Sequence, residues 1–599
     1  MTRIVPLLRS YLRSGNMGYL RKWLLIGSLI GVAAGLGSIA FFTAMTWATK
    51  LFLGLGTGFV PPAPVGEGET VVTAIARRWM IPVVTTLGGL ISGLIVYKLT
   101  PEAEGDGADA AIEAFHHKDG MIRSRVPLVK LLTSAITIGS GGSAGREGPI
   151  AQIAAGFGSV LGRLLKLSVQ ERRIAVAAGI GAGIGAIFKT PLGGALLSTE
   201  ILYLEGFEVG ALVPSFIASV IGYSIFASWV GYTPMFGSHY DIVFNDPYSL
   251  LYYAALGLIC GGVGILYPRC FYGMRNLFRS LRIPNYLKPA LGGLGVGILG
   301  LFLPQVLGTG YGWLQIVMEP QLTIPTGLMV LLAFAKIVAT SLSVGSGGSG
   351  GVFAPGLFIG GMLGAAFWSG LHNIAPHVPP TPEPFVVVGM VALFGGVAHA
   401  PLAVMFMVGE MTGSYTMLAP AMLAVGISYV IVGRNSIYEN QVESPAKSPA
   451  HRYEYSFPLL TQLSVKDALR TDITPVTTED TVEQVEQRLL SDTLKSLPVI
   501  DPQTGNLAGV VSLEDILLRA PARDGTSIRD VMSTNVVTIT TEDSLARVME
   551  LMSRHDVSSL PVLENSGRGS KLVGVISRRD VARVYTRAAE RLLRKEISQ

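Results

Sequence analysis

The sequence predicts an all-α polytopic membrane domain with an internal repeat, followed by a soluble α/β domain that is itself duplicated. Three observations lead to this fold class. The 599 residues are 49% hydrophobic and only 15% charged, and the mean hydropathy is +0.49. Several apolar runs approach the ~20 residues that cross a bilayer as a helix. Both the apolar part and the polar C-terminal part of the chain repeat themselves.

The apolar runs that predict membrane spans are residues 23–47, 80–97, 250–267 and 418–433. Other apolar runs are shorter and broken by glycine. The chain has 73 glycines, well above the roughly 7% of average usage, and many of them lie inside the apolar half. Such interruptions indicate main chain that leaves the helix inside the membrane, where protein or a water-filled cavity must surround it.

The charge distribution predicts the orientation of the chain. Five basic residues and no acidic ones precede the first span, so we expect a cytoplasmic N-terminus. The first span is too long for a signal-peptide core, and we expect it to be retained. The net charge of +5 is explained by basic cytoplasmic loops and does not imply nucleic acid as a partner. We therefore expect an integral multi-pass protein of the plasma (inner) membrane. The basic residues are Arg3, Arg9, Arg13, Arg21 and Lys22.

A change in composition near residue 440 divides the chain. Beyond it, a polar linker leads into short β-branched strands that alternate with amphipathic helices, as in a soluble α/β domain. The expected domains are a cytoplasmic N-terminal segment (1–22), a membrane domain (23–440, with halves 23–230 and 245–440), a linker (441–460) and two small domains (461–521 and 522–599).

One phrase recurs in the two membrane halves: GSGGSAGREGP at residues 139–149 and GSGGSGGVFAP at residues 345–355. Three further features recur in the same order. Lys130 and Lys336 precede the phrase by equal distances, GDG at 105–107 is loosely matched by GTG at 308–310, and Pro191 with Glu200 is matched by Pro401 with Glu410. The order and spacing predict a duplicated membrane domain, and transporters of this kind commonly place their halves in opposite orientations.

Each phrase is typical of a loop that leads into a helix N-terminus, because glycine allows close approach of the main chain and proline is favoured in the first helical turn. Two such termini directed at one point favour an anion, since their free N–H groups and the helix dipoles are positive. Close helix packing explains either glycine-rich phrase alone. Their equivalent places in a duplication favour the anion site.

The soluble tail also repeats. Residues 465–480 recur at 528–543, and SLPVI at 496–500 recurs as SLPVL at 559–563. Each copy is expected to bury its apolar face against the other. The two cysteines, Cys260 and Cys270, indicate no disulfide framework. We find no metal-ligand spacing, nucleophile elbow or phosphate-binding loop, and His116 and His117 form no metal-ligand spacing, so we do not expect an enzyme.

The motifs GREGP at 145–149, GVFAP at 351–355 and SIYENQ at 436–441 resemble the signatures of the CLC family of chloride channels and proton-coupled chloride exchangers. The tail resembles a tandem pair of CBS domains. The resemblance implies about eighteen mostly tilted helices in two inverted halves. It also implies a homodimer through the membrane and CBS domains, with one ion pathway per subunit and chloride as the substrate ion.

The resemblance assigns site residues. The main-chain N–H groups of Val352 and Phe353 would coordinate the anion, with Gly148 and its neighbours Gly145 and Arg146 at an outer site. The hydroxyl of Tyr438 would donate to the central anion. Glu147 would gate the pathway: its carboxylate competes with the anion, and protonation removes the competition. The alternative for Glu147 is a stabilising acid in the first helical turn.

Four basic residues have two possible interpretations each. Arg146 is either part of an electropositive entrance or an interfacial side chain that reaches water. Lys130 and Lys336 either raise the potential of an anion pathway or form ion pairs that hold the fold together. Lys189 either attracts anions on the inner approach or follows the positive-inside tendency, which we favour.

Asp106 is a first departure from the family pattern, because it stands where a serine hydroxyl usually faces the central anion. An ionised carboxylate there should repel chloride. We consider three roles: a neutral carboxyl in low-dielectric surroundings, a cap of the following helix, or participation in proton movement.

Ile201 is a second departure. It aligns with the internal proton-transfer glutamate of the family's exchangers, and isoleucine carries no proton. This favours a passive channel for chloride or a similar small anion, with fluoride, nitrate and bicarbonate as alternatives. A proton-coupled antiporter is the runner-up, because Glu205, expected one helical turn further on, or Asp106 could supply a carboxylate. A membrane receptor or scaffold that senses nucleotide is a third candidate.

In the tail, Ser512 with Asp515 and Ser577 with Asp580 have the spacing of a helix cap. Nucleotide-binding CBS domains use these positions for ribose and phosphate contacts. The resemblance therefore implies an adenine nucleotide as a regulatory ligand of the pair, with capping as the alternative. No cofactor or metal is required for transport.

Overall fold

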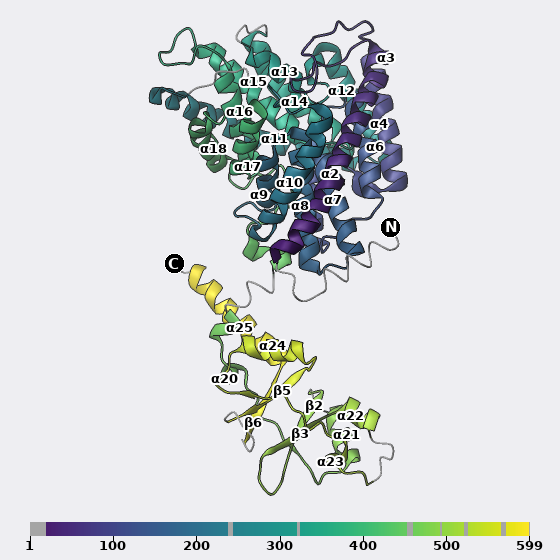
Figure 1. Ribbon diagram of the computed structural model, residues 1–599, viewed down its shortest axis with the longest axis vertical. Helices are drawn as coiled ribbons and strands as arrows, with labels where there is room; N and C mark the ends of the chain where they lie inside the picture. Colours follow the sequence, from purple (N-terminus) through teal and green to yellow (C-terminus); the bar gives the residue numbers. More distant parts are fainter. Residues whose placement is uncertain are drawn as a thin grey trace. The chain divides into compact units, whose positions relative to one another are not determined.

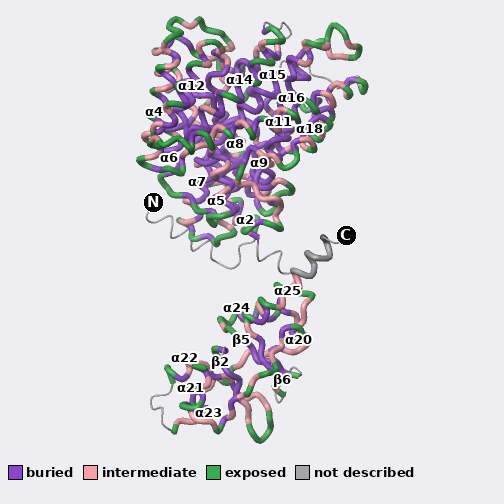
Figure 2. Tube along the Cα trace, turned by 180° about the vertical axis from the view of Figure 1, so that it is seen from behind, coloured by how far each residue is buried: buried purple, intermediate pink, exposed green. Residues whose placement is uncertain are grey.

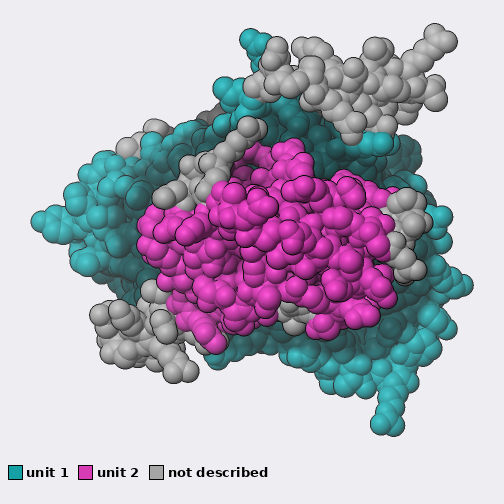
Figure 3. All heavy atoms as spheres, turned by 90° about the horizontal axis from the view of Figure 1, so that it is seen from below, with its two compact units in different colours: residues 1–450 teal, residues 451–599 magenta. Residues whose placement is uncertain are grey.

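The computed structural model describes residues 19–237, 244–319, 324–451, 459–491, 494–519, 525–564 and 571–597. The chain divides into two compact units, Met1–Ala450 and His451–Gln599, which Figure 3 colours separately. The division falls within residues 441–460, which the sequence predicts to be a linker. Residues 1–18 of the expected N-terminal segment, 452–458 of the expected linker and 565–570 between the last two strands lie outside the described residues.

The first half of the membrane unit begins with α2 (Tyr19–Thr49), which continues through a π-turn into α3 (Leu55–Thr57). Figure 1 shows α2 crossing the height of this unit beside α8 and α10. The remaining helices of this half are α4 (Met80–Leu99), α5 (Gly107–His117), α6 (Val126–Gly139), α7 (Glu147–Leu164), α8 (Val169–Phe188), α9 (Pro191–Glu200) and α10 (Val209–Val230).

The second half is built from equivalent helices, and the buried core runs through the interior of the unit (Figure 2). Its helices are α11 (Leu250–Ser280), α12 (Lys288–Phe302), α13 (Tyr311–Met318), α14 (Thr326–Ser343), α15 (Phe353–Leu371), α16 (Glu383–Val397), α17 (Pro401–Thr412) and α18 (Leu418–Val432).

Within the described residues, six segments are long and apolar enough to span a membrane. Three contain the predicted spans 23–47, 80–97 and 250–267. The predicted span at 418–433 forms α18, a helix of only 15 residues, which is shorter than the ~20 residues that cross a bilayer. The helices α9 and α17, of 10 and 12 residues, are shorter still. Helices shorter than a membrane span, which the interruption of apolar runs by glycine predicts, are therefore present.

The helices α9 and α17 demonstrate that the two halves are inverted. The carboxylate at the end of α9, Glu200, accepts hydrogen bonds from the N–H groups of Leu402 (3.3 Å) and Ala403 (2.7 Å) at the start of α17. Glu410 of α17 accepts in the same way from Leu192 (3.1 Å) and Gly193 (2.8 Å) at the start of α9. Each helix therefore ends where its equivalent begins, which requires that the two run antiparallel.

Glycine sets the distance between some of these helices. A Cβ on Gly360 of α15 would lie 2.2 Å from the carbonyl oxygen of Gly389 in α16, and a Cβ on Gly389 would lie 2.3 Å from that of Gly360. Both contacts are far inside van der Waals distance, so an alanine at either position would force the helices apart. Close packing is thus one use of the glycines in the apolar half.

The second unit contains two similar three-stranded sheets, in the orders β1-β2-β3 and β4-β5-β6. In each sheet the first pair of strands is parallel and the second pair antiparallel. The hydroxyls of Ser496 and Ser559, which are equivalent in the two copies, share a 2.7 Å hydrogen bond. The two copies thus meet at matching positions.

The elements of the first copy are α20 (Val465–Ala468), β1 (Val476–Thr477), α21 (Val482–Ser491), β2 (Ser496–Ile500), β3 (Leu507–Ser512) and α22 (Leu513–Arg519). Those of the second copy are α23 (Ile528–Val531), β4 (Ile539–Thr540), α24 (Leu545–Arg554), β5 (Ser559–Leu563), β6 (Leu572–Ser577) and α25 (Arg578–Ile597).

The mutual capping of α9 and α17 gives a stability prediction. Replacing Glu200 with alanine leaves the buried N–H of Ala403 without an acceptor, which costs about 1–3 kcal/mol, and also removes the acceptor of the part-buried N–H of Leu402. We expect a lower midpoint for thermal unfolding of the purified protein, measured by loss of the monodisperse fraction in detergent. Glu200→Gln keeps one carbonyl oxygen and should lose less. The control is Glu113→Ala, which removes only an exposed ion pair with Lys118; an equal loss for Glu113→Ala would contradict the capping role.

Candidate functional site

The N-termini of α7 and α15 meet in the interior of the membrane unit, each preceded by one copy of the glycine-serine phrase. Gly145 and Gly351 exchange two main-chain hydrogen bonds, of 2.7 and 2.8 Å. A Cβ on Gly351 would lie 2.8 Å from the amide nitrogen of Gly148. Only glycine permits this approach, and it brings two helix N-termini to one place.

The carboxylate of Glu147, the first residue of α7, lies between the two helix N-termini. It is 1% exposed. Its Oε2 accepts a hydrogen bond of 3.3 Å from the N–H of Ala354 in the first turn of α15. Its Oε1 accepts a short hydrogen bond from the Tyr311 hydroxyl. A negatively charged group of the protein thus occupies the position toward which the N–H groups of the opposite half point.

Aromatic side chains enclose this position. The ring of Phe353 packs against Phe394 with a centroid distance of 4.2 Å and against Phe188 at 5.5 Å. The hydroxyl of Tyr267, on α11, donates to the carbonyl of Val352 at 2.9 Å, which fixes the loop just before α15. Aromatic rings therefore form part of the surroundings of the Glu147 carboxylate, and the charge of Arg146 lies close enough to interact with it.

Asp106 caps α5, the short helix that begins beside α7. One of its oxygens accepts from the N–H of Asp109 at 3.2 Å, so the capping role is present. The other, Oδ1, is buried without a hydrogen-bond partner among the described residues. A Cβ on Gly148 would lie 2.0 Å from this oxygen. The structure thus brings Asp106 against the residue that follows Glu147.

Lys130 and Lys336 occupy equivalent positions in the two halves. The ammonium of Lys130 donates to the carbonyls of Ala103 (3.1 Å) and Gly105 (2.7 Å). That of Lys336 donates to the carbonyls of Val306 (2.9 Å) and Gly308 (2.8 Å). Each lysine therefore holds the GDG or GTG loop of its own half through main-chain carbonyl oxygens. Neither of the two interpretations given for these lysines had specified carbonyl oxygens as the partners.

Arg146 is buried, with 1% of its surface exposed. Its guanidinium forms a two-pronged ion pair with Glu67, in the loop that follows α3. It also lies 5.4 Å from the ring centres of Phe188 and Tyr311. In the structure Arg146 is neither an open entrance nor an interfacial side chain, because Glu67 pairs its charge within the protein.

Tyr438 is buried in the loop after α18, and its main-chain N–H donates to the Ser436 hydroxyl at 3.0 Å. It lies within electrostatic range of the carboxylates of Asp106 and Glu147. It also lines a cavity of about 380 Å³, which we call the lower cavity. The other lining residues are Leu204, Pro268, Arg269, Tyr272, Arg434, Asn435, Ser436, Glu439 and Gln441.

Ile201 follows the last residue of α9 and is fully buried among apolar side chains. Its carbonyl accepts from the amide of Gln441 at 2.8 Å. The expectation that Glu205 continues the helix by one turn is wrong, because α9 ends at Glu200. Glu205 is an exposed residue of the following segment, where its N–H donates to the carbonyl of Glu443 at 2.9 Å.

Three residues of this site escaped the sequence reasoning. Tyr311 directly follows the GTG loop that matches GDG, and this neighbourhood was a signal for it. Ala354 is one residue beyond Phe353, which the sequence had suggested as a donor. Which of these neighbouring N–H groups points at the site depends on where α15 begins, and the sequence does not fix that residue. Glu67 lies 79 residues before Arg146 in a loop with no recurring motif, so nothing in the sequence pointed to it.

In the soluble unit, Ser512 with Asp515 and Ser577 with Asp580 form helix caps. Each serine hydroxyl donates to the aspartate, at 2.6 and 2.5 Å, and accepts from its N–H. The pairs also line two cavities. Ser577 and Asp580 line one of about 620 Å³, which we call the basic cavity, and Ser512 and Asp515 line one of about 1010 Å³.

Comparison with known proteins agrees with this geometry. The voltage gated chloride channel family model matches residues 88–433, and the CBS domain model matches residues 465–521 and 528–587. A ClcB-like chloride channel protein of Ralstonia nicotianae is 35% identical over 424 residues, covering 69% of this chain and 95% of the relative. The H(+)/Cl(-) exchange transporter ClcA of Cronobacter sakazakii is 30% identical and covers 67% of this chain and 84% of the relative.

Among solved structures, the chain resembles the crystal structure of a eukaryotic CLC transporter. The TM-score is 0.58 at 21% sequence identity, and the match covers 96% of this chain and 98% of that one. This likeness confirms the predicted fold class, a CLC-like membrane domain with a CBS pair. The family match extends over more than half of the chain and includes both helix N-termini that meet at Glu147. The chain therefore belongs to the voltage-gated chloride channel family and carries two CBS domains.

Proposed function

We propose that this chain transports chloride or a similar small anion through a pathway that Glu147 gates. The observation that carries the proposal is the hydrogen bond from the Ala354 N–H to the Glu147 carboxylate. Helix N-termini bind anions, and here a tethered carboxylate takes the place of one. An anion can replace it only when the carboxylate moves away, and protonation favours that movement by removing its charge.

Chloride is the anion that the names of the channel and exchanger relatives carry. A solved CLC-type fluoride/proton antiporter is also similar in fold, so fluoride stays an alternative, with nitrate and bicarbonate. The feature of this chain that bears on which anion is transported is Oδ1 of Asp106, which lies against Gly148 and has no hydrogen-bond partner among the described residues.

The mode of transport depends on whether a proton passes Ile201. The apolar environment of this residue favours passive conduction, as the sequence predicts. The exchange activity in the name of the Cronobacter relative keeps proton-coupled exchange as the second candidate, and the burial of the titratable residue His399 favours it.

We further propose a homodimer in the plasma (inner) membrane, with one pathway in each subunit and with the N-terminus and CBS pair in the cytoplasm. The basic residues Arg21 and Lys22 at the start of α2 support this orientation. Because the CBS pair follows the last membrane helix of the same chain, a ligand of the pair is suited to regulate transport.

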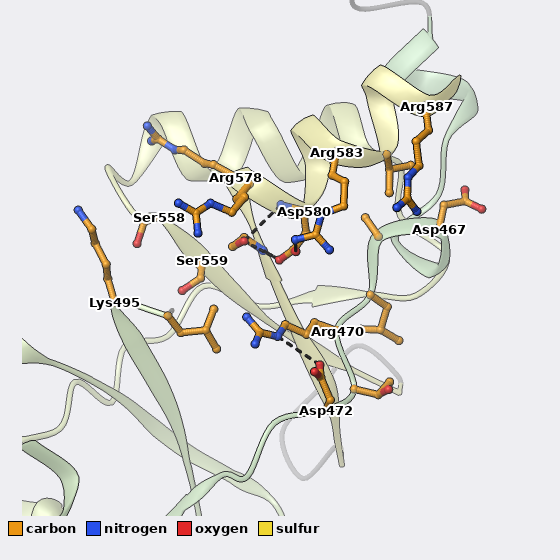
Figure 4. Close-up of a pocket in the computed structure, with 17 residues that line it drawn as sticks. Asp467, Arg470, Asp472, Lys495, Ser558, Ser559, Arg578, Asp580, Arg583 and Arg587 are labelled. Carbon is orange, nitrogen blue, oxygen red and sulfur yellow. Dashed lines mark hydrogen bonds and ion pairs between the residues drawn. The ribbon is translucent and has the colours of Figure 1, made fainter. Parts of the chain in front are cut away.

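The basic cavity is the best candidate for an adenine nucleotide. Arg470, Lys495 and Arg578 line it together with Asp580 at the start of α25 (Figure 4). Arginine and lysine are the common partners of phosphate oxygens. A carboxylate at the edge of such a cavity suits the hydroxyls of a ribose. Three more arginines line the same cavity: Arg579, Arg583 and Arg587.

The second cavity has a different character. It contains one lysine, Lys495, opposed by Glu514, Asp515 and Asp556, and much of its wall is apolar. The two cavities therefore do not offer equal sites to a phosphate-bearing ligand. We place the nucleotide in the basic cavity.

Glu147→Gln tests the gate. Glutamine is isosteric and uncharged at every pH, so acidification can no longer neutralise the group. In liposomes with a chloride gradient, we expect chloride efflux of the parent protein to rise as the pH falls from about 7 to about 5. We expect Glu147→Gln to be active at both values with little or no pH dependence.

The matched control for the gate is Glu69→Gln, which neutralises an exposed carboxylate in the loop after α3 and should leave the pH dependence unchanged. An unchanged pH dependence in Glu147→Gln would reject the gating role. Absence of flux of any anion in the parent protein would reject the proposed function itself.

Tyr311→Phe tests the donor that holds the carboxylate. Hydrogen bonds to charged groups are worth about 1.5–3 kcal/mol, and their loss should release the carboxylate more often. We expect faster chloride efflux at neutral pH, with Tyr286→Phe at a partly exposed position as the control. Slower efflux in Tyr311→Phe would show that the hydroxyl serves the anion instead of the closed gate.

Nucleotide binding is tested by isothermal titration of the full-length protein with ATP, ADP and AMP. We expect measurable heat and a loss of affinity of about tenfold or more when Arg578 becomes alanine, since one phosphate contact is removed. Arg547→Ala, on the exposed face of α24 and paired with Glu550, is the control. No heat beyond dilution for all three nucleotides would contradict the assignment.

A further inference from the structure

His399 lies two residues before α17, and the residue that precedes it shares a hydrogen-bond donor with Ile201. The amide of Gln441 donates to the carbonyls of both Ile201 (2.8 Å) and Ala398 (2.9 Å), which ties the end of α9 to the residue before His399. On the other side of the histidine, the carboxylate of Glu200 caps the start of α17. Hydrogen bonds therefore hold the main chain on both sides of His399.

The imidazole is buried without a hydrogen-bond partner. It is 4% exposed, and neither ring nitrogen makes a hydrogen bond of good geometry among the described residues. Buried polar groups in native proteins are nearly always satisfied, and an exception calls for an explanation. The carbonyls of Leu204 and Asn435 lie near the ring. Burial away from water favours the neutral ring. Because carbonyls only accept, protonation of the ring would supply a second N–H donor for them.

The equivalent residue in the other half shows that the fold does not itself require this state. Lys189 and His399 both have left-handed backbones, with φ values of 60° and 53°, and both stand two residues before the proline that starts the next helix. The ammonium of Lys189 donates to the carbonyls of Gly66 and Thr233, each at 2.7 Å. The side chain at this position thus has hydrogen-bond partners in the first half and has none of good geometry, among the described residues, in the second.

Residues near the His399 ring line the lower cavity, whereas His399 itself does not. Leu204 and Asn435, whose carbonyls lie near the ring, both line this cavity, as does Gln441. Tyr438 lines it too. A small displacement of these residues would connect the imidazole with water and with the segment that carries Tyr438.

The charged and titratable groups around His399 come from four elements. Glu205, in the segment after α9, interacts electrostatically with the ring and favours a positive charge on it. The Tyr429 ring of α18 contacts it edge-on at 5.1 Å. Glu200 of α9 is engaged in capping α17. Arg434 and Glu439 line the neighbouring cavity and are partly paired, with Glu443 and Arg275 respectively.

We propose that His399 binds the transported proton on the inner side of the membrane, so that this chain exchanges an anion for protons. A ring nitrogen takes a proton from water of the lower cavity, and the reverse step returns it. On the outer side the Glu147 carboxylate takes and releases the proton. Only N–H and O–H bonds form and break. This inference rests on the proposed function and assigns its mode.

The test uses the full-length protein in liposomes with an outward chloride gradient, a chloride electrode and a pH-sensitive dye. We expect the parent protein to drive protons uphill as chloride leaves. His399→Asn is the principal variant, because asparagine tolerates a left-handed backbone and carries no proton. We expect it to keep chloride flux and to lose about tenfold or more of the proton flux, since histidine is the group that titrates near neutral pH.

Further variants separate a proton-binding role from a structural one. His399→Glu restores a titratable group and should recover proton flux, whereas His399→Gln should not. His372→Gln, at an exposed histidine stacked on Trp368, is the control and should leave both fluxes unchanged. If His399→Asn is not monodisperse, the comparison of His399→Gln with His399→Glu decides the same question.

Each outcome separates the two proposals. Chloride flux without uphill protons in the parent protein would overturn the role of His399 and leave the proposed function intact. The same holds if His399→Asn moves protons with the parent stoichiometry. Absence of both fluxes in the parent protein would instead overturn the proposed function.

Discussion

The two hydrogen bonds exchanged by Gly145 and Gly351 are the contact on which the candidate pathway depends. They join the loops that lead into α7 and α15, and they are possible because neither residue has a side chain. With a larger residue at either position, the two helix N-termini would separate. The positive ends of two helices would then no longer converge on one place in the membrane interior, and the anion site would lose half of its donors.

Negative charge in the membrane unit repeatedly appears at helix N-termini of the opposite half. Glu147 contacts α15, Glu200 contacts α17 and Glu410 contacts α9. Each carboxylate is stabilised by N–H groups that would otherwise be unsatisfied in an apolar interior. Glu200 and Glu410 each accept from two N–H groups, whereas Glu147 accepts from one N–H group and from the hydroxyl of Tyr311, both in the second half. The partners of Glu147 thus differ in kind and not in number.

The repeats made much of the fold predictable, because equal offsets between motifs identify equivalent helices before any coordinates are known. Helix ends were less predictable. Glu205 was expected on α9, but the helix stops at Glu200, where the chain turns to meet residues 442–443. Contacts between distant loops, such as Glu67 with Arg146, depend on tertiary structure alone. His399 appeared in the sequence as one histidine among eight, and only its burial and missing partners distinguish it.

The reciprocal contacts also bear on how such a chain arose. Ser143 bonds to Thr340, and the equivalent pair in the opposite sense, Ser349 with Ser134, bonds as well. Ser349 is the equivalent of Ser143, and Thr340 is the equivalent of Ser134, so the same contact forms twice. Such doubled contacts are typical of a two-fold symmetric dimer. Two copies of a half-length chain inserted in opposite orientations would therefore be able to form this interface with each other. Joining the two in one polypeptide leaves each half free to differ from the other, as Lys189 and His399 do.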